Sequence, residues 1–431
     1  MFLKKKFPQF CLIFSILLLV YIIYRSEIFW DGTRSSYYSS YYFLSLVFII
    51  FSIITFFLNE KFNKYLLIII FSITLSFYSF EAYLNYQFFK KYRIYKSEIG
   101  INYDVRSKLE IYNDLNKTNN YVVDIGGKYY FSMEKEENLL PLSGISNSKT
   151  IHCNENGYYS IYDSDRYGFN NPNESWDEDN IEYLIVGDSF VHGNCVNRPN
   201  DISSVLRNLS NKTVLNLGYE HHRGPLLEYA SLREYLTPSI KKIIWVYFEG
   251  NDLIDLKNEL NSKILRNYMD DLEFSQNLKS KQNKINKIAR KIIESKKIYK
   301  KEHNRFLKSI KLYNTRTLLK QITSPKSQPL LQPEFKEILK LTNELALKNN
   351  AKLFFIYLPE YERFKTNYDN KNYISVKKII NELNITFVDI NYEVFEKELD
   401  PLKLFPFSMP GHYNVEGYKK VAEKIYELTK N

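Results

Sequence analysis

Cysteine is scarce in this chain, which contains only three among 431 residues. Cys11 lies in an apolar segment near the N-terminus, which leaves Cys153 and Cys195 as the only expected pair. A disulfide between them is compatible with a position outside the cytoplasm, where oxidising conditions let disulfides persist. The chain also has no cysteine cluster and no His-Glu-x-x-His spacing, so we expect no catalytic metal.

Histidine is also sparse, and three of the six histidines raise a metal alternative: His192, His221 and His222. Adjacent residues such as His221 and His222 point to opposite faces of a strand, so the two would not easily chelate one ion. We therefore expect neither a metal nor another cofactor. His192 and Arg223 could instead line the mouth of a cleft, where they would meet a sugar or an acidic group.

Nucleic-acid-binding motifs are absent, although 59 Lys and Arg outnumber 49 Asp and Glu and give a net charge of +10. Much of this excess lies in short clusters beside apolar segments and in one basic helical stretch. The excess hints at affinity for anionic surfaces such as membrane lipid, and a nucleic-acid partner is not expected.

Charged residues are nearly missing from three apolar runs, residues 8–24, 41–58 and about 65–83. Each is close to the roughly 20 residues that span a bilayer as a helix, so residues 1–90 are predicted to form a membrane anchor with three transmembrane helices. No small-residue cleavage site follows the first run, which favours an anchor over a signal peptide. A hairpin of buried soluble helices is the alternative for the second and third runs, but the only charge in either is Glu81.

Basic residues beside these runs predict the orientation of the chain. Lys4 to Lys6 precede the first run, and Lys61 and Lys64 lie between the second and third, which favours a cytoplasmic N-terminus. Three spans then place the rest of the chain outside, in the periplasm or the extracellular space. A further basic cluster after the third run conflicts with this orientation: Lys90, Lys91, Arg93 and Lys96. Because the first helix usually dominates, we retain the extracytoplasmic expectation.

The remainder of the chain divides into a turn-rich lead-in, residues 97–180, and a region of alternating strands and helices, residues 181–431. The predicted strands are Tyr183–Val186, Thr213–Leu217, Ile243–Phe248, Lys352–Tyr357 and Thr386–Ile390. The predicted helices are Ser203–Ser210, Leu226–Leu236, Glu334–Asn349, Tyr373–Leu383 and Val415–Thr429. This alternation predicts an α/β domain with a five-stranded parallel sheet that helices cover on both faces.

A long insertion, residues 253–333, separates the third predicted strand from the fourth. It is rich in Lys, Asn and Ile and shows helical periodicity, which is typical of a solvated helical excursion. A lid or docking arm over a cleft is the alternative, because the insertion leaves the sheet directly after Asn251 and Asp252.

Polar blocks follow the predicted strands at the edge of the sheet where ligands bind in open α/β folds. The blocks are Gly187-Asp188-Ser189-Phe190, Asn216-Leu217-Gly218 and Gly250-Asn251-Asp252 after the first three strands, and His412-Tyr413-Asn414 before the last helix. Four blocks in this order resemble those of the SGNH (GDSL-type) hydrolases. The resemblance implies a flavodoxin-like three-layer α/β/α domain with esterase, lipase or carbohydrate O-acetyl chemistry.

Ser189 is the candidate nucleophile and His412 the candidate base, because a serine hydroxyl attacks poorly until a base takes its proton. Asn251 and the backbone N–H groups of Ser189 and of Gly218 or Gly224 could form an oxyanion hole. The alternatives are a turn histidine satisfied by backbone for His412, and a capping residue for Asn251.

Met409 stands three residues before His412, where the SGNH hydrolases carry an aspartate that orients the histidine. Loss of such a carboxylate lowers kcat by orders of magnitude in serine proteases. Either a backbone carbonyl or a distant acid orients His412, or activity is weak or lost.

Three functions are compatible with these features. The first is a membrane-anchored, extracytoplasmic SGNH-type esterase or O-acyltransferase that acts on ester groups of a surface glycan or lipid through an acyl-enzyme on Ser189. A transferase would need a separate membrane protein as acyl donor, since three spans are few for carrying an acyl group across a bilayer. The second is a catalytically weak or inactive glycan-binding or assembly protein of the same fold, which Met409 suggests. The third is a membrane sensor that docks through the basic insertion.

Overall fold

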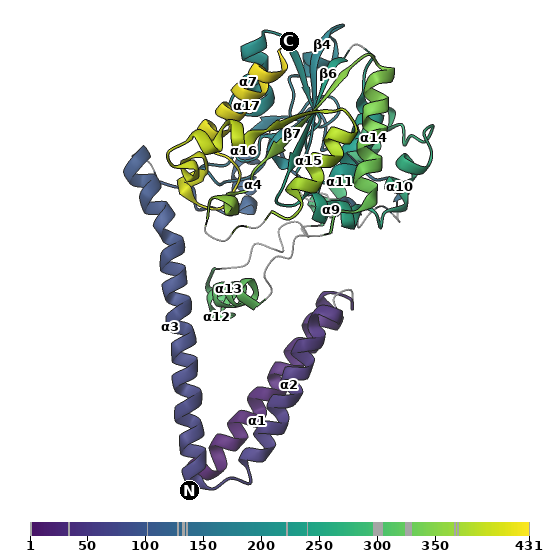
Figure 1. The fold of residues 1–431 in the computed structure, drawn as a ribbon. Helices are drawn as coiled ribbons and strands as arrows, with labels where there is room; N and C mark the ends of the chain where they lie inside the picture. Colours follow the sequence, from purple (N-terminus) through teal and green to yellow (C-terminus); the bar gives the residue numbers. More distant parts are fainter. Residues whose placement is uncertain are drawn as a thin grey trace. The chain divides into compact units, whose positions relative to one another are not determined.

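The structure is a computed structural model, and it describes all residues except 1, 33–34, 101, 127–128, 132–133, 135–136, 221–222, 239, 296–304, 324–329, 366–367, 369 and 431. The chain divides into two compact units (Figure 1). Met1–Phe88 and Arg305–Thr323 form the helical unit, and Phe89–Asn304 and Ser324–Asn431 form the α/β unit.

A five-stranded parallel sheet in the order β5-β4-β6-β7-β8 forms the centre of the α/β unit (Figure 1). Its strands are β4 (Ile181–Val186), β5 (Thr213–Asn216), β6 (Ile240–Phe248), β7 (Lys352–Leu358) and β8 (Thr386–Asp389). Counted along the chain, the order is 2-1-3-4-5, which is the flavodoxin-like order. The predicted fold class is therefore confirmed, and each predicted strand is present.

Helices cover both faces of this sheet because successive side chains of each strand point to opposite sides. Leu184 and Val186 pack in one core, and Tyr183 and Ile185 pack in the other. The first core contains α8 (Pro225–Tyr235), α11 (Gln282–Glu294), α14 (Pro333–Lys348) and α15 (Tyr373–Glu382). The second contains α6 (Ser189–His192), α7 (Ile202–Ser210), α16 (Ile390–Glu393) and α17 (Val415–Thr429). Figure 1 shows α7 and α17 on the side of the sheet opposite α14.

A second, smaller sheet lies in the segment that the sequence indicated as an irregular lead-in. Its strands are β1 (Tyr121–Val123), β2 (Lys149–Ile151) and β3 (Ile161–Asp163), with β1 parallel and β3 antiparallel to β2. A short helix, α4 (Lys108–Leu115), begins with a capping box formed by Ser107 and Glu110. Buried side chains of this segment, such as Val123 and Ile151, belong to the same core as Leu184. The segment is therefore an ordered part of the α/β unit.

Short 3₁₀ helices complete the α/β unit at Asn173–Trp176, Leu278–Lys281, Tyr361–Phe364, Phe395–Lys397, Pro401–Leu404 and Pro406–Ser408. The last three of them lead directly to the loop that carries His412.

The helical unit contains α1 (Phe2–Ile23), the π-helical turn η1 (Tyr24–Phe29), α2 (Ser35–Thr55) and α3 (Glu60–Ile99), of which residues up to Phe88 belong to this unit. Three helical segments among the described residues are long and apolar enough to cross a membrane: Lys6–Phe29, Ser35–Thr55 and Glu60–Gln87. The three predicted apolar helices are thus confirmed in number and position.

The insertion does not form a solvated excursion. Its first half, α9 (Asp252–Glu259), α10 (Lys263–Asp270) and α11, buries Leu256, Leu265 and Ile288 in the core of the α/β unit. Its second half, α12 (Arg305–Ile310) and α13 (Tyr313–Thr323), belongs to the helical unit. The Lys and Asn content suggested solvent exposure throughout, but the apolar residues of the first half lie in the core of the α/β unit.

Candidate active site

Ser189 lies directly after strand β4, as the first residue of the short helix α6. Asp188 caps this helix, since its carboxylate accepts a hydrogen bond of 2.9 Å from the N–H of Phe190. The turn is tight at Gly187, where a Cβ atom would come within 2.5 Å of the Val191 side chain. The local sequence therefore fixes the hydroxyl at the carboxyl edge of the sheet.

The second predicted block, Asn216-Leu217-Gly218, packs against α6. Asn216, the last residue of β5, donates from its side-chain amide to the carbonyl of Val191 at 2.7 Å. Its side-chain oxygen accepts from the N–H of Gly218 at 2.8 Å. A Cβ atom at Gly218 would lie 2.4 Å from the backbone nitrogen of His192, so glycine permits this close approach. Both residues hold the nucleophile helix in place.

His412 meets Ser189 at hydrogen-bonding distance. Its Nε2 lies 2.9 Å from the Ser189 Oγ, although the two residues are 223 positions apart. The loop that carries His412 is held by the two residues that follow the histidine. Tyr413 donates to the carbonyl of Pro359 at 2.8 Å, and Asn414 caps α17 by accepting from the N–H of Gly417. The structure thus brings the predicted nucleophile and base together.

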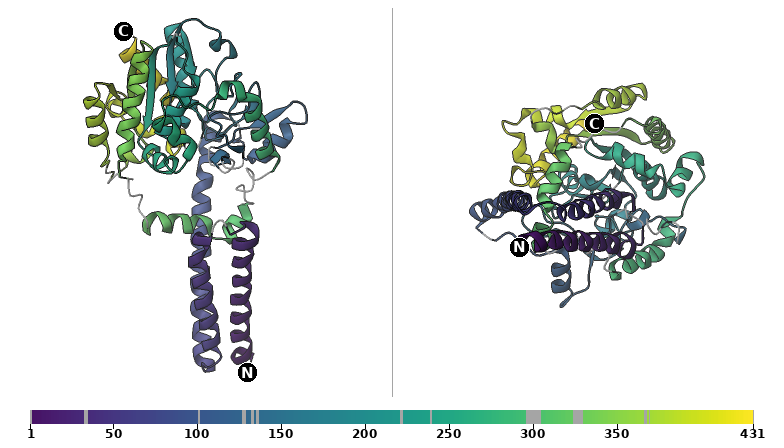
Figure 2. Two further views of the ribbon diagram at one scale, coloured as in Figure 1. Left: turned by 90° about the vertical axis from the view of Figure 1, so that its right-hand side faces the viewer. Right: turned by 90° about the horizontal axis from the view of Figure 1, so that it is seen from below.

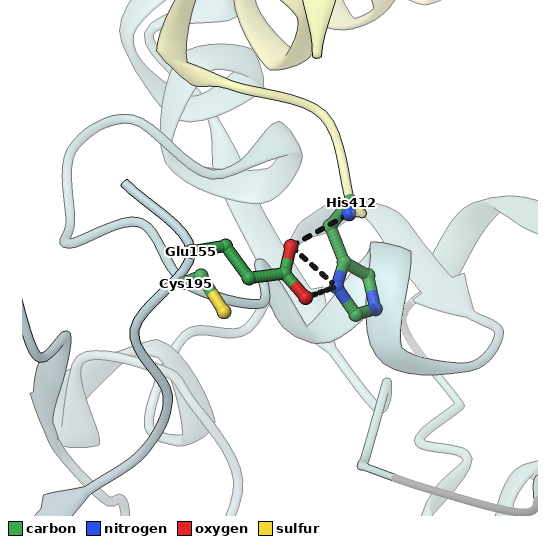
Figure 3. A group of neighbouring side chains, drawn as sticks. All are labelled: Glu155, Cys195 and His412. Carbon is green, nitrogen blue, oxygen red and sulfur yellow. Dashed lines mark hydrogen bonds and ion pairs between the residues drawn. The ribbon is translucent and has the colours of Figure 1, made fainter. Parts of the chain in front are cut away.

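Met409 offers no carboxylate to His412, but Glu155, from a distant part of the chain, does. Both oxygens of Glu155 lie 3.1 Å from the Nδ1 of His412, and one of them also accepts the backbone N–H of His412 at 2.7 Å (Figure 3). A Cβ atom at Gly411 would lie 2.7 Å from the same carboxylate, so glycine at this position leaves room for it. Ser189, His412 and Glu155 are therefore arranged in space as the three members of a Ser-His-acid triad are.

Glu155 lies in the loop between β2 and β3, and this loop is tied down at several points. Cys153 forms a disulfide with Cys195, which lies six positions after Ser189. Asn156 donates to the carbonyl of Cys195 at 3.0 Å, and Asn154 donates to the carbonyl of Asp104 at 2.8 Å. The disulfide therefore connects the loop of the acid to the loop that follows the nucleophile helix.

The charge of Glu155 sets the protonation of His412. Burial lowers the pKa of the imidazole, but the charge and hydrogen bond of Glu155 outweigh this effect, so the pKa of His412 lies above its usual value. The Asp188 carboxyl is 2% exposed, and burial raises its pKa to about 6. Its Oδ2 lies 3.4 Å from the Ser189 Oγ, which is farther than His412 Nε2. His412 is therefore the base with the better geometry.

Asn251 follows β6, the neighbour of β4, and precedes α9. Its amide donates to the Asp255 carboxylate at 2.6 Å, which uses one of the two amide hydrogens and orients the other. The N–H of Ser189 is in the first turn of α6, where N–H groups have no acceptor inside the helix. These two groups therefore remain candidates for the predicted oxyanion hole.

Gly218 and Gly224 do not support that role. The Gly218 N–H donates to Asn216, and the Gly224 N–H donates to the buried Glu259 at 2.5 Å. Glu259 also accepts from Leu226 and so caps the N-terminus of α8. Both glycine N–H groups thus have acceptors within the fold.

His192 and Arg223 do not line a cleft mouth, contrary to the prediction. His192 is fully buried, with its ring 4.5 Å from that of His152. Arg223 is buried as well and donates to the carbonyl of Leu142 at 3.0 Å and to Ser231. His192 packs against Tyr162 of the small sheet, and Arg223 is enclosed beside α8, to which Ser231 belongs. His221 and His222 lie outside the described residues.

Two groups of donor atoms in the described residues have the spacing of metal ligands. In the first, Glu155 and His412 belong to the triad and the sulfur of Cys195 is oxidised in the disulfide (Figure 3). The second comprises Asp124, His152 and Glu220, where the Lys108 ammonium already pairs with Asp124 at 2.5 Å. Neither group offers a set of uncommitted ligands.

Comparisons with known proteins add little to this picture. No protein-family model and no curated protein matches the chain. Among solved structures, a protein of Desulfitobacterium hafniense DCB-2 that is assigned to the G-D-S-L family of lipolytic proteins matches with 17% identity and a TM-score of 0.33. The match covers 58% of this chain and 99% of that chain. At these values we draw no argument from the match, and the fold class rests on the sheet itself.

Proposed function

We propose that this protein is a membrane-anchored, extracytoplasmic ester hydrolase or O-acyltransferase of SGNH type. One observation carries the proposal, namely the chain of contacts from Glu155 through His412 to the hydroxyl of Ser189. A hydroxyl hydrogen-bonded to a carboxylate-oriented imidazole is the arrangement that acyl transfer through serine uses. The glycan-binding alternative rested on Met409, and Glu155 now accounts for the missing carboxylate.

The first half of the reaction forms an acyl-enzyme. The Ser189 Oγ attacks the ester carbonyl carbon while its proton moves to His412 Nε2. The ester C–O bond then breaks, and the leaving alcohol takes the proton from Nε2. Glu155 stabilises the imidazolium that exists between these two proton transfers, and Asn251 with the Ser189 N–H holds the oxyanion.

The second half releases the acyl group. Water or a sugar hydroxyl gives its proton to His412 Nε2 and attacks the acyl carbon, and the bond from the acyl carbon to Ser189 Oγ breaks. The Ser189 oxygen then takes the proton back. Water yields a carboxylic acid, whereas a sugar yields a new ester. For the transferase case, we propose that a separate membrane protein supplies the acyl group.

The disulfide and the apolar helices support the proposed location and substrate class. A disulfide between Cys153 and Cys195 supports an oxidising compartment for the α/β unit. Three membrane-length helices keep the enzyme at the bilayer, which favours ester groups on surface glycans or lipids as substrates. Two free thiols at positions 153 and 195 in protein from native membranes would contradict the extracytoplasmic location.

Covalent capture tests the activity without a known substrate. We expect a fluorophosphonate probe to label the full chain in detergent, and Ser189→Ala to abolish the labelling, because only an activated serine reacts readily. Ser210→Ala is the matched control, since Ser210 lies in the same unit and its hydroxyl hydrogen-bonds with the backbone of Leu206 and Lys212. Absence of labelling in folded wild-type protein would refute the proposal. A chromogenic acetyl ester, offered with and without a glycan acceptor, then distinguishes hydrolysis from transfer.

A further inference from the structure

A buried carboxylate in the third membrane-length helix accepts hydrogen bonds from the N-terminus of α13, a helix of the insertion. Glu81 is 1% exposed within the apolar segment Glu60–Gln87 of α3. It accepts hydrogen bonds from the backbone N–H groups of Asn314 at 3.2 Å and Thr315 at 2.8 Å. The side chains of the same two residues also donate to it, at 3.0 and 2.8 Å. Asn314 and Thr315 are in the first turn of α13, so Glu81 caps that helix and its charge faces the positive end of the helix dipole.

Two further contacts fix the junction of α12 and α13 against the same face of α3. Tyr78 donates to the carbonyl of Ile310 at 2.8 Å, and Asn85 donates to the hydroxyl of Ser309 at 3.1 Å. Positions 78, 81 and 85 recur every three or four residues and so lie on one side of the helix. Charged residues inside an apolar segment are rare and demand such partners. The docking of α12 and α13 is therefore built into the sequence of the helical unit.

The charged residues of this docked segment are all basic. Residues 305–323 contain five basic residues and no Asp or Glu. The basic residues are Arg305, Lys308, Lys311, Arg316 and Lys320. In the same segment, Leu307, Ile310, Leu319 and Ile322 expose 44%, 45%, 46% and 67% of their surface. Both helices run crosswise to the long axes of the membrane-length helices, as the two views of Figures 1 and 2 show.

We propose that α12 and α13 form an interfacial element that lies on the bilayer surface and binds anionic lipid headgroups. A helix with apolar and basic residues and low overall hydrophobicity rests at the lipid–water boundary, with its apolar side chains at the acyl chains and its basic side chains at phosphates. The contacts with α3 near Glu81 lie toward the end of the apolar segment, and they hold α12 and α13 at the level of the lipid–water boundary. A lipid surface also accounts for the charge, because the segment has no acidic residue that would pair these cations.

Lipid-borne quenchers test the placement. We replace Cys11 by Ala, introduce Ile322→Cys, label it with an environment-sensitive fluorophore, and reconstitute the full chain into nanodiscs that contain spin-labelled phosphatidylcholine. We expect quenching of about twofold or more at position 322. The matched control is Leu347→Cys on α14, which is 66% exposed in the α/β unit and should be quenched little. Equal, weak quenching at both sites would overturn the proposal.

Charge removal tests the headgroup preference. Native mass spectrometry of wild-type protein from mixed phosphatidylcholine and phosphatidylglycerol nanodiscs should show retained phosphatidylglycerol. The fourfold variant Lys308→Gln/Lys311→Gln/Arg316→Gln/Lys320→Gln should lose this preference on the order of tenfold. The fourfold Lys→Gln control at exposed positions 336, 340, 378 and 419 of the α/β unit should keep it. An unchanged preference in the first variant would overturn the proposal. Fluorophosphonate labelling of Ser189 reports folding, and if the variant does not fold, the quenching experiment decides alone.

Discussion

Glu155 holds the imidazole of His412 from a position 257 residues earlier in the chain, with both carboxylate oxygens 3.1 Å from Nδ1. The acid therefore belongs to the loop of a separate small sheet and not to the loop that carries the histidine. The Glu155 carboxylate also accepts the backbone N–H of His412, which adds a second constraint on the position of the histidine. In the proposed mechanism, activation of Ser189 therefore depends on how the small sheet packs against the five-stranded one.

Replacement of Glu155 by Gln should lower kcat by about 10²- to 10⁴-fold, because an amide neither stabilises the imidazolium nor enforces its tautomer. The pH dependence should change as well. The base form of His412 is neutral, so activity rises with pH through its pKa, which Glu155 raises above the usual value near 6.5. Without that charge, burial dominates and the acidic limb of kcat/KM should move to lower pH. A pH–rate profile of both proteins measures this shift.

Met409 provides the matched comparison. Met409→Leu should keep wild-type activity, since the acid of the proposed mechanism is Glu155, whose carboxylate lies 3.1 Å from His412 Nδ1. The ester assay used for Glu155→Gln measures both variants side by side. A large loss in Met409→Leu together with a mild effect of Glu155→Gln would contradict the assignment of the acid.

Most of the fold and two residues of the triad could be predicted from sequence. The strands from Ile181 onward are continuous apolar runs, and a buried parallel sheet demands that pattern. Ser189 and His412 stand out because polar residues break these runs at a strand end and before the last helix. Glu155 has no such signal, since it lies in a polar, turn-rich loop without periodicity. The one available hint was the expected pairing of Cys153 with Cys195, which brings that loop beside Ser189.

The features that the sequence did not reveal depend on contacts with other parts of the chain. Gly218 and Gly224 each offer an N–H near the expected site, but sequence does not reveal that Asn216 and Glu259 accept these hydrogens. The split of the insertion between two units was equally hidden. Glu81 was visible as a lone charge in an apolar run, yet its partners at Asn314 and Thr315 are more than 230 residues away.

The disulfide should contribute to both stability and catalysis. Its two cysteines are 42 residues apart, so the Cys153→Ser/Cys195→Ser variant should lose up to roughly 4 kcal/mol of unfolding free energy in the chain-entropy estimate. The loop of Glu155 should also loosen, which lowers kcat more than it changes KM. Denaturant unfolding and steady-state kinetics measure the two effects. Cys11→Ser, which leaves the disulfide intact, is the control and should change neither.

Asn251 and Asp255 should act as a coupled pair in stabilising the oxyanion. Asn251→Ala should lower kcat by about 10²- to 10³-fold with little change in KM, as expected for a donor that serves mainly the transition state. Asp255 accepts one hydrogen of the Asn251 amide at 2.6 Å, so we expect it to position Asn251. Asp255→Ala should therefore cause a smaller loss in kcat, and Asp255→Asn, which keeps an acceptor oxygen, should restore much of it.

A double-mutant cycle separates this role from a general effect on folding. If Asp255 acts through Asn251, the loss in Asn251→Ala/Asp255→Ala should be close to that of Asn251→Ala alone. Additive losses would show that Asp255, which is 3% exposed, matters through the packing of α9 instead. Unfolding temperatures of the single variants provide the control, because a structural defect lowers them in proportion to the lost activity whereas a lost orientation does not.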